Sequence, residues 1–299
     1  MMIPSRNEHT IAAGCEVHGR GYWSGQPVRV RIDPAPAGSG IRLVRADLPD
    51  RPECLASFRT TQGCRYRTNL ASGNARFEMV EHLMAALAAL EIDNCRVRID
   101  AEELPGLDGS SGPYVEALRR AGLVIQARLR PRLVITERVR LELDGGWVEA
   151  GPSPDGGTHF EYRLSYDDGS PIPAQRYRCR LTPEHFIREI ASARTFVTAG
   201  QADELRSRGI ARHVTEQDLL VFDESGPRAN RLRYPDECAR HKTLDLIGDL
   251  SLAGGDLVGR FVSHRGGHRL NAMLARELGS RLSDTCRRVA PDDAGRFAA

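Results

Sequence analysis

Residues 77–90 read FEMVEHLMAALAAL, and from residue 78 onward the pattern is helical. The apolar side chains recur every three or four residues, which places them on one face of a helix. This stripe consists of Val80, Leu83, Met84, Leu87 and Leu90. The strand-like segment NCRVRID follows at residues 94–100. The sequence therefore predicts a helix that packs an apolar face against a neighbouring sheet.

The same order of elements recurs in the second half of the chain. Residues 236–255 read DECARHKTLDLIGDLSLAGG, a predicted helix with acidic residues in its first turn and two glycines at its end. The strand-like segment DLVGRFVSH follows at residues 256–264. Each of the two helices carries a histidine near its beginning. We therefore expect an α+β fold of two related domains, each a β-sheet covered by helices.

The basic segment QARLRPRLVI, at residues 126–135, is expected to link the two domains. We predict a first domain over residues 1–126, a second over residues 127–280, and a polar, poorly ordered tail over residues 281–299. Residues 28–45 alternate apolar and charged side chains around a Pro/Gly turn, which predicts a hairpin in the first domain. In the second domain, a strand, a helix and a strand fit an insertion around residues 194–223, the size of a βαβ crossover.

Composition narrows the class of protein. The 299 residues contain 42 Lys and Arg against 40 Asp and Glu, a net charge of +2 that argues against a nucleic-acid-binding protein. The 7 cysteines are scattered, which indicates reduced thiols and not a disulfide framework or a thiolate zinc site. No apolar run suggests a signal peptide or a membrane span. We expect a cytoplasmic protein, with no obligate protein partner evident.

Histidines and carboxylates on the two predicted helices suggest a metal site. His241 and Asp245 lie four residues apart, so both side chains share one face, and imidazole and carboxylate are ordinary zinc ligands. His82, on the first helix, would complete a set of three and leave the fourth position open for water. Glu81 beside it would then take a proton from that water. The alternatives are a surface hydrogen bond between His241 and Asp245, and a partly buried His82 bonded to the backbone.

A third histidine follows two glycines in the segment SHRGGHRLN, at residues 263–271. His268 at this turn suits a general acid, because imidazole titrates near neutral pH. Asp249 lies one helical turn beyond Asp245 and is positioned to hold the His268 ring in its charged form. The sequence therefore predicts a general acid, His268, and its carboxylate partner, Asp249, beside the metal site.

These patterns together resemble the UDP-3-O-acyl-N-acetylglucosamine deacetylases, zinc amidases that commit a sugar nucleotide to lipid A biosynthesis. The stretches that carry the resemblance, from about residue 20 to residue 280, are MVEHLMAALAALEIDN, LPGLDGSSGPYV, ASARTF, ELRSRGIA, RHKTLDLIGDLSLAGG and GGHRLNAMLAREL. The resemblance implies two βααβ-type domains with the active site in the cleft between them. It also implies a hydrolase that removes the N-acetyl group of a UDP-linked acylated amino sugar, with the insertion forming a passage for the acyl chain.

The resemblance assigns roles to individual residues. The implied metal ligands are His82, His241 and Asp245, holding one zinc ion per chain, although iron(II) suits the same ligands. The implied catalytic groups are Glu81 as general base, His268 as general acid, Asp249 as its partner and Thr195 as a hydroxyl that stabilises the oxyanion. The implied substrate contacts are Lys242, Tyr166 and Phe196.

Two segments depart from the family pattern. Residues 21–25 read GYWSG where the family usually has Gly-Leu-His-Ser/Thr-Gly, so Trp23 replaces a histidine that borders the active site. Residues 210–214 read IARHV, which brings bulk and charge to a stretch that is usually small and glycine-containing. Two alternative functions therefore stay open. One is a zinc deacetylase acting on a different N-acylated sugar or nucleotide, and the other is a ligand-binding homologue without catalysis.

Overall fold

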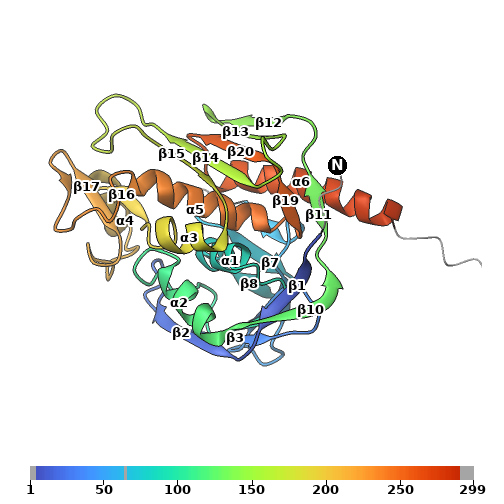
Figure 1. Ribbon diagram of the computed structural model, residues 1–299. Coiled ribbons are helices and arrows are strands. Elements are labelled where there is room, and N and C mark those ends of the chain that lie inside the picture. Colours follow the sequence, from blue (N-terminus) through green and yellow to red (C-terminus); the bar gives the residue numbers. More distant parts are fainter. Residues whose placement is uncertain (1–4, 64–65, 290–299) are drawn as a thin grey trace, which may run out of the picture.

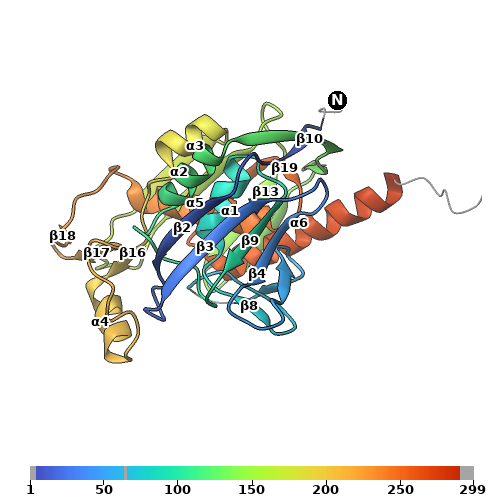
Figure 2. The same ribbon diagram turned by 90° about the horizontal axis from the view of Figure 1, so that it is seen from below.

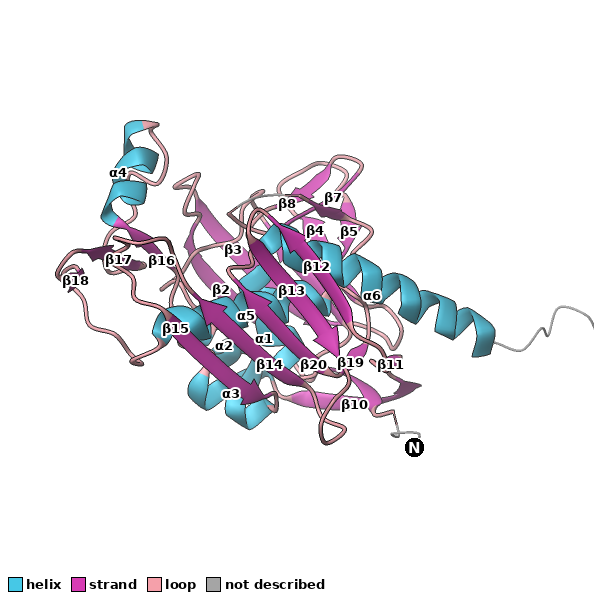
Figure 3. Ribbon diagram, turned by 90° about the horizontal axis from the view of Figure 1, so that it is seen from above, coloured by secondary structure: helices cyan, strands magenta, loops and turns pink. Residues whose placement is uncertain are grey.

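Two five-stranded sheets enclose a layer of helices (Figure 1). The computed structural model describes residues 5–63 and 66–289. The first sheet contains, in spatial order, β2 (Cys15–Arg20), β3 (Pro27–Pro34), β9 (Cys95–Ile99), β4 (Ile41–Arg45) and β5 (Glu53–Leu55). The second contains β12 (Val139–Leu143), β13 (Gly146–Gly151), β20 (Arg260–His264), β14 (His159–Leu164) and β15 (Gln175–Arg180), which lie side by side in Figure 3.

The two sheets have the same topology. In the first, the central strand β9 runs antiparallel to β3 and parallel to β4. In the second, the central strand β20 runs antiparallel to β13 and parallel to β14. Each central strand follows the buried helix of its own half. The prediction of two related α+β units is therefore confirmed at the level of strand order and direction.

Helices α1 (Glu81–Ala89) and α5 (Glu237–Ser251) pack against each other between the sheets. Eight of the nine residues of α1 are buried, so this helix has no solvent-facing side and the predicted single apolar stripe understates its burial. The helices approach closely because α5 carries Gly248 at the contact. A Cβ atom there would lie 2.2 Å from the carbonyl oxygen of Glu81, which excludes any larger residue unless the helices move apart.

The remaining helices cover the ends and edges of this layer. They are α2 (Gly112–Ala121), α3 (Pro183–Glu189), α4 (Ala199–Ser207) and α6 (His268–Val289). At the start of helix α3 the Thr182 side chain accepts a hydrogen bond from the His185 N–H, and proline takes the first helical position. Helix α6 runs past the expected start of the polar tail at residue 281. Residues 290–299 lie outside the described part of the chain.

Two local predictions differ from the structure. Residues 28–45 do not form a hairpin, because β9 lies between β3 and β4 and pairs with both. The six-residue segment between Pro34 and Ile41 is long enough to carry the chain past β9, whereas a hairpin favours a tight turn. The expected linker is built of strands. β10 (Leu123–Leu129) pairs with β1 (Asn7–Ile11), and β11 (Arg132–Val134) pairs with β19 (Asp256–Val258).

The insertion near residue 196 is a crossover unit that projects from one end of the molecule (Figure 2). β16 (Phe196–Thr198) and β17 (Leu220–Asp223) are parallel, with α4 between them, which confirms the predicted βαβ order. β17 also pairs with the short β18 (Gly226–Pro227). A further small sheet is formed by β6 (Thr61–Gln62), β7 (Asn69–Ser72) and β8 (Ala75–Phe77). Within residues 5–63 and 66–289, no helix has the length and hydropathy needed to cross a membrane.

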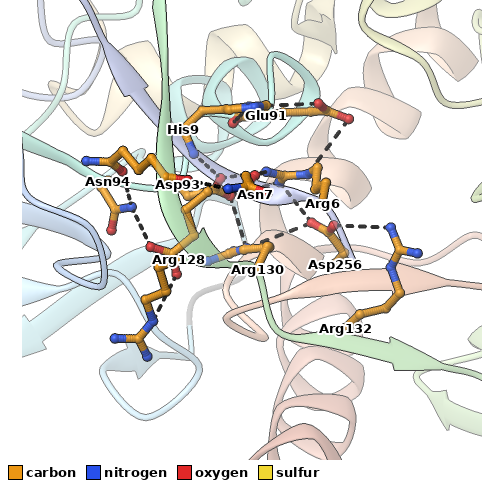
Figure 4. Close-up of polar contacts among 12 residues, drawn as sticks. Arg6, Asn7, His9, Glu91, Asp93, Asn94, Arg128, Arg130, Arg132 and Asp256 are labelled. Atoms are coloured by element: carbon orange, nitrogen blue, oxygen red, sulfur yellow. Dashed lines mark hydrogen bonds and ion pairs between the residues drawn. The ribbon is translucent and has the colours of Figure 1, made fainter. Parts of the chain in front are cut away.

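A cluster of ion pairs joins the two halves (Figure 4). Arg6 donates to both oxygens of Asp93, at 2.6 and 2.8 Å, and to Asp256 Oδ1 at 2.9 Å. Arg130 Nε lies 3.0 Å from Asp93 Oδ1. Because Asp93 follows α1 in the first half and Asp256 begins β19 in the second, the two arginines connect both halves through buried or half-buried charges.

We expect Asp93→Ala to destabilise the protein by about 3 kcal/mol, because it removes the buried carboxylate that pairs with Arg6 and Arg130 and leaves Asp256 to pair with both. Urea unfolding of the variant and the wild type measures this change in the free energy of unfolding. Arg208→Ala, which removes a fully surface-exposed ion pair with Glu204, is the control and is expected to cause no measurable change. Equal stability of Asp93→Ala and the control would contradict the structural role of the cluster.

Candidate active site

Three buried side chains from the two central helices converge on one point. His82 is the second residue of α1, while His241 and Asp245 lie one turn apart on α5. Asp245 Oδ1 is 3.5 Å from His241 Nε2 and 3.8 Å from His82 Nε2. Ligands of a tetrahedral zinc ion are separated by roughly 3.4 Å. Asp245 Oδ1 is buried and has no hydrogen-bond partner among the described residues, so this oxygen and the two nitrogens fit a single metal ion.

The surroundings of these side chains favour metal binding. The Nδ1–H of His241 donates to the Ala193 carbonyl at 3.1 Å, which leaves the Nε2 lone pair facing the site. Lys242 Nζ donates to the other oxygen of Asp245, at 2.6 Å. Burial lowers the pKa of His82 to about 3 and also lowers the pKa of His241, so both rings are neutral, as metal ligands must be.

Asp245 stays ionised in this buried position. Burial alone would raise the pKa of its carboxyl, but the adjacent His241 ring and the Lys242 ammonium outweigh burial and hold the pKa well below its usual range. Lys242 stays charged for the reciprocal reason. Burial would lower its pKa, and the Asp245 carboxylate raises the pKa above the usual range for lysine. The site therefore offers an anionic oxygen to a metal ion.

Glu81 directly precedes His82 and takes the first position of α1. Its side chain is buried, and its Oε2 accepts a hydrogen bond from the Thr68 N–H at 2.9 Å. Burial raises the pKa of Glu81 to about 7, while the positive charge of His268 opposes the rise. A carboxylate with a pKa near neutrality, held beside a metal site, suits a general base.

His268 begins α6, and its ring approaches Asp245 of the three converging groups. Its Nε2 is 3.8 Å from Asp245 Oδ2, and its Nδ1–H donates to Asp249 Oδ2 at 2.9 Å. Burial would lower the pKa of His268, but the adjacent Asp249 carboxylate outweighs burial and raises the pKa to about 9. A protonated imidazole beside the metal site suits a general acid.

Three further predicted site residues, the catalytic Thr195 and the substrate contacts Phe196 and Tyr166, differ in how close they lie to this centre. The Thr195 hydroxyl lies 3.3 Å from His241 Nε2, and the Phe196 ring meets the His241 ring edge to face, with centroids 6.0 Å apart. Tyr166 is 41% exposed and lines an open groove between the loop after β14 and the insertion. Thr195 is thus beside the candidate metal site, while Tyr166 lines a groove at the surface.

Two further residues hydrogen-bond to Asp249, the partner of His268. The Thr68 hydroxyl donates to Asp249 Oδ1 at 2.5 Å, and Asn271 Nδ2 donates to Asp249 Oδ2 at 2.9 Å. Sequence reasoning missed both residues. Asn271 carries a usable signal, because it lies three residues after His268 and so on the same face of α6. Thr68 carries no such signal, since it is 181 residues from Asp249 in the sequence.

The two segments that depart from the family pattern touch each other. His213 Nε2 lies 2.8 Å from the Gly21 carbonyl, which can only accept, so this nitrogen carries the proton. The N–H groups of Trp23 and Ser24 both donate to Glu103, at 2.8 Å. The Arg67 guanidinium lies over the Trp23 ring, 4.4 Å from its centroid. Arg67 directly precedes Thr68, which contacts Glu81 and Asp249. The two departures from the family pattern therefore lie together in one region beside the candidate site.

Comparison with known proteins identifies one family. Residues 8–280 match the family described as LpxC, UDP-3-O-acyl N-acetylglycosamine deacetylase. Proteins named UDP-3-O-acyl-N-acetylglucosamine deacetylase are similar over nearly their whole length. The protein of Thermosynechococcus vestitus is 37% identical over 277 residues, covering 92% of this chain and 95% of the relative. The protein of Psychrobacter arcticus is 35% identical over 282 residues, covering 93% and 86%. The protein of Brucella ovis is 37% identical over 279 residues, covering 93% and 96%.

Proposed function

The chain belongs to the UDP-3-O-acyl N-acetylglycosamine deacetylase family, and on that premise we propose which reaction it performs and with which residues. The proposed reaction is hydrolysis of the N-acetyl group of UDP-3-O-acyl-N-acetylglucosamine, which releases acetate and is the committed step of lipid A biosynthesis. The observation that carries the proposal is the convergence of His82, His241 and Asp245 at one point, close to a base, Glu81, and an acid, His268.

Zinc is the proposed cofactor, one ion per chain, held by the two imidazoles and the carboxylate. The burial of the three ligands and the unpaired oxygen of Asp245 support this set, and iron(II) suits the same ligands. A bound divalent ion would supply Lewis acidity toward the acetamide carbonyl and toward the attacking water. The described cysteines form no disulfide with one another, which supports a reducing compartment such as the cytoplasm.

The residues around the ion divide the proton transfers between them. Glu81 takes a proton from the attacking water, whose oxygen forms a bond to the acetamide carbonyl carbon. The Thr195 hydroxyl and the His268 N–H stabilise the negative charge that develops on the carbonyl oxygen. His268 then gives its proton to the amine nitrogen as the C–N bond breaks. The products are acetate and the free amine of the sugar. Lys242, Tyr166 and Phe196 are the proposed contacts to the UDP-linked sugar.

The pH dependence of kcat/KM tests these assignments. Glu81 acts as a base only when ionised, and burial raises its pKa to about 7, so activity should rise with pH through that region. His268 acts as an acid only when protonated, and Asp249 outweighs burial to raise its pKa to about 9, so activity should fall at higher pH. A bound cation moves both limbs to lower pH. Rates measured between about pH 5 and pH 10 should give a bell-shaped curve, and a flat curve would contradict both roles.

A zinc deacetylase for a different N-acylated sugar is the second candidate, favoured by the contact between the Trp23 segment and His213. The metal-loaded protein should be given UDP-3-O-(3-hydroxyacyl)-N-acetylglucosamine and, separately, UDP-N-acetylglucosamine, with acetate and free amine measured. Turnover that requires the 3-O-acyl group supports the proposed substrate. No turnover of either compound, by a protein that holds one metal ion per chain, would overturn it and make Trp23→His the first variant to test.

A further inference from the structure

Thr68 lies where the two halves of the active site meet. It directly precedes β7 in the first half of the chain, and its side chain is buried. Its N–H donates to Glu81 Oε2 at 2.9 Å. Its hydroxyl reaches across to the second half, where it lies 2.5 Å from Asp249 Oδ1 and 3.2 Å from His268 Nδ1. One residue therefore contacts the proposed base, the proposed acid and the partner of that acid.

The direction of each hydrogen bond follows from the chemistry of the groups. The Asp249 carboxylate can only accept, so the Thr68 hydroxyl donates to it. The Thr68 oxygen then presents its lone pairs to the Nδ1–H of His268, which also donates to Asp249 Oδ2 at 2.9 Å. Asn271 donates to the same Oδ2 atom. With Nδ1 held between two acceptors, the ring directs Nε2 toward the metal site, 3.8 Å from Asp245 Oδ2.

We propose that Thr68 is a positioning residue that holds the general base and the general acid in one fixed geometry. Its N–H orients the Glu81 carboxylate, and its hydroxyl orients the Asp249–His268 pair. Thr68 acts through these groups and transfers no proton itself. The inference rests on the proposed function, because the roles of Glu81 and His268 come from it.

The N–H and the hydroxyl can be separated by substitution. Thr68→Val keeps the size and the N–H contact to Glu81, but it places a methyl group against Asp249 Oδ1. Thr68→Ser restores the hydroxyl. A displaced catalytic group commonly costs about 10²-fold in rate, so we expect Thr68→Val to lower kcat by about 10- to 100-fold with little change in KM. We expect Thr68→Ser to recover most of the lost kcat.

A double substitution shows whether Thr68 acts through His268. In a His268→Ala background the hydroxyl has no acid to orient, so adding Thr68→Val should lower kcat only slightly further. Thr10→Val is the matched control, because Thr10 is also buried in the first half and also donates its hydroxyl to an oxygen atom, the Asn94 carbonyl at 2.6 Å. The control should keep the wild-type kcat, and each variant should keep one metal ion per chain.

The outcomes separate this inference from the proposed function. A wild-type protein without deacetylase activity would overturn the proposed function itself. An active wild type with a Thr68→Val variant at full kcat, or with a loss confined to KM, would overturn only the role of Thr68. Should Thr68→Val not fold, Thr68→Ala takes its place in the comparison with Thr68→Ser. Equal kcat values in Ala and Ser variants would then contradict the inference.

Discussion

Replacing Glu81 by glutamine is expected to lower kcat by about 10²- to 10⁴-fold, the range that a general base commonly contributes. Glutamine has nearly the same size, and its amide oxygen can accept the Thr68 N–H as the carboxylate does. It cannot accept a proton from water at neutral pH. The variant should therefore fold and bind metal while turnover is lost. Acetate release gives kcat, and elemental analysis gives the metal content.

The matched control is Glu116→Gln, a change on the exposed surface of α2 that removes an ion pair with Arg120. It should keep both the wild-type kcat and one metal ion per chain. A Glu81→Gln variant that retains metal and turns over at nearly the wild-type rate would show that another group takes the proton. The remaining candidate acid–base group beside the metal site is His268, whose pKa the Asp249 carboxylate raises to about 9 against the effect of burial.

Asp245→Ala is expected to abolish both metal binding and turnover. The substitution removes the unpaired oxygen on which the two imidazoles converge. Loss of a group that only supports a metal ligand costs about 10- to 100-fold in affinity, and loss of the ligand itself should cost more. After dialysis against a chelator and reloading with zinc, the wild type should hold one ion per chain and the variant none.

Asp236→Ala tests whether the loss of another aspartate beside this helix also prevents metal binding. Asp236 precedes α5 and holds Arg240 at 2.6 Å, without contacting the three converging side chains. This variant should reload with zinc as the wild type does. An Asp245→Ala protein that still binds one zinc ion tightly would contradict the assignment of the ligands, whatever its activity.

Local spacing in the sequence predicted which two side chains lie together on the second helix, but the metal site itself followed only with the family resemblance, since a surface hydrogen bond was the alternative. His241 and Asp245 share a helix face because they are four residues apart, and the structure places them 3.5 Å apart. The pairing of His82 with them depended on recognising a second helix of the same kind. Helix burial was harder to predict. The predicted stripe left the alanines of α1 off the apolar face, yet eight of its nine residues are buried, and the helix packs against α5 and α2.

The sequence pattern could not predict contacts between segments that are far apart in the chain. Thr68 meets Asp249 across 181 positions, and His213 meets Gly21 across 192. Neither contact leaves a periodic trace, because each depends on how the two halves and the insertion dock. The failed hairpin has a similar cause. β3 alternates as a half-buried strand should, but β9, from residues 95–99, is inserted between it and β4.

Acetate release from UDP-3-O-(3-hydroxyacyl)-N-acetylglucosamine, measured side by side for the zinc-loaded wild type and Glu81→Gln, tests the central claim most directly. We expect one acetate and one free amine per substrate consumed by the wild type, and a rate of acetate release that is lower by about 10²-fold or more in the variant. Equal rates in the two proteins, or substrate left intact by a wild type that holds one zinc ion, would contradict it.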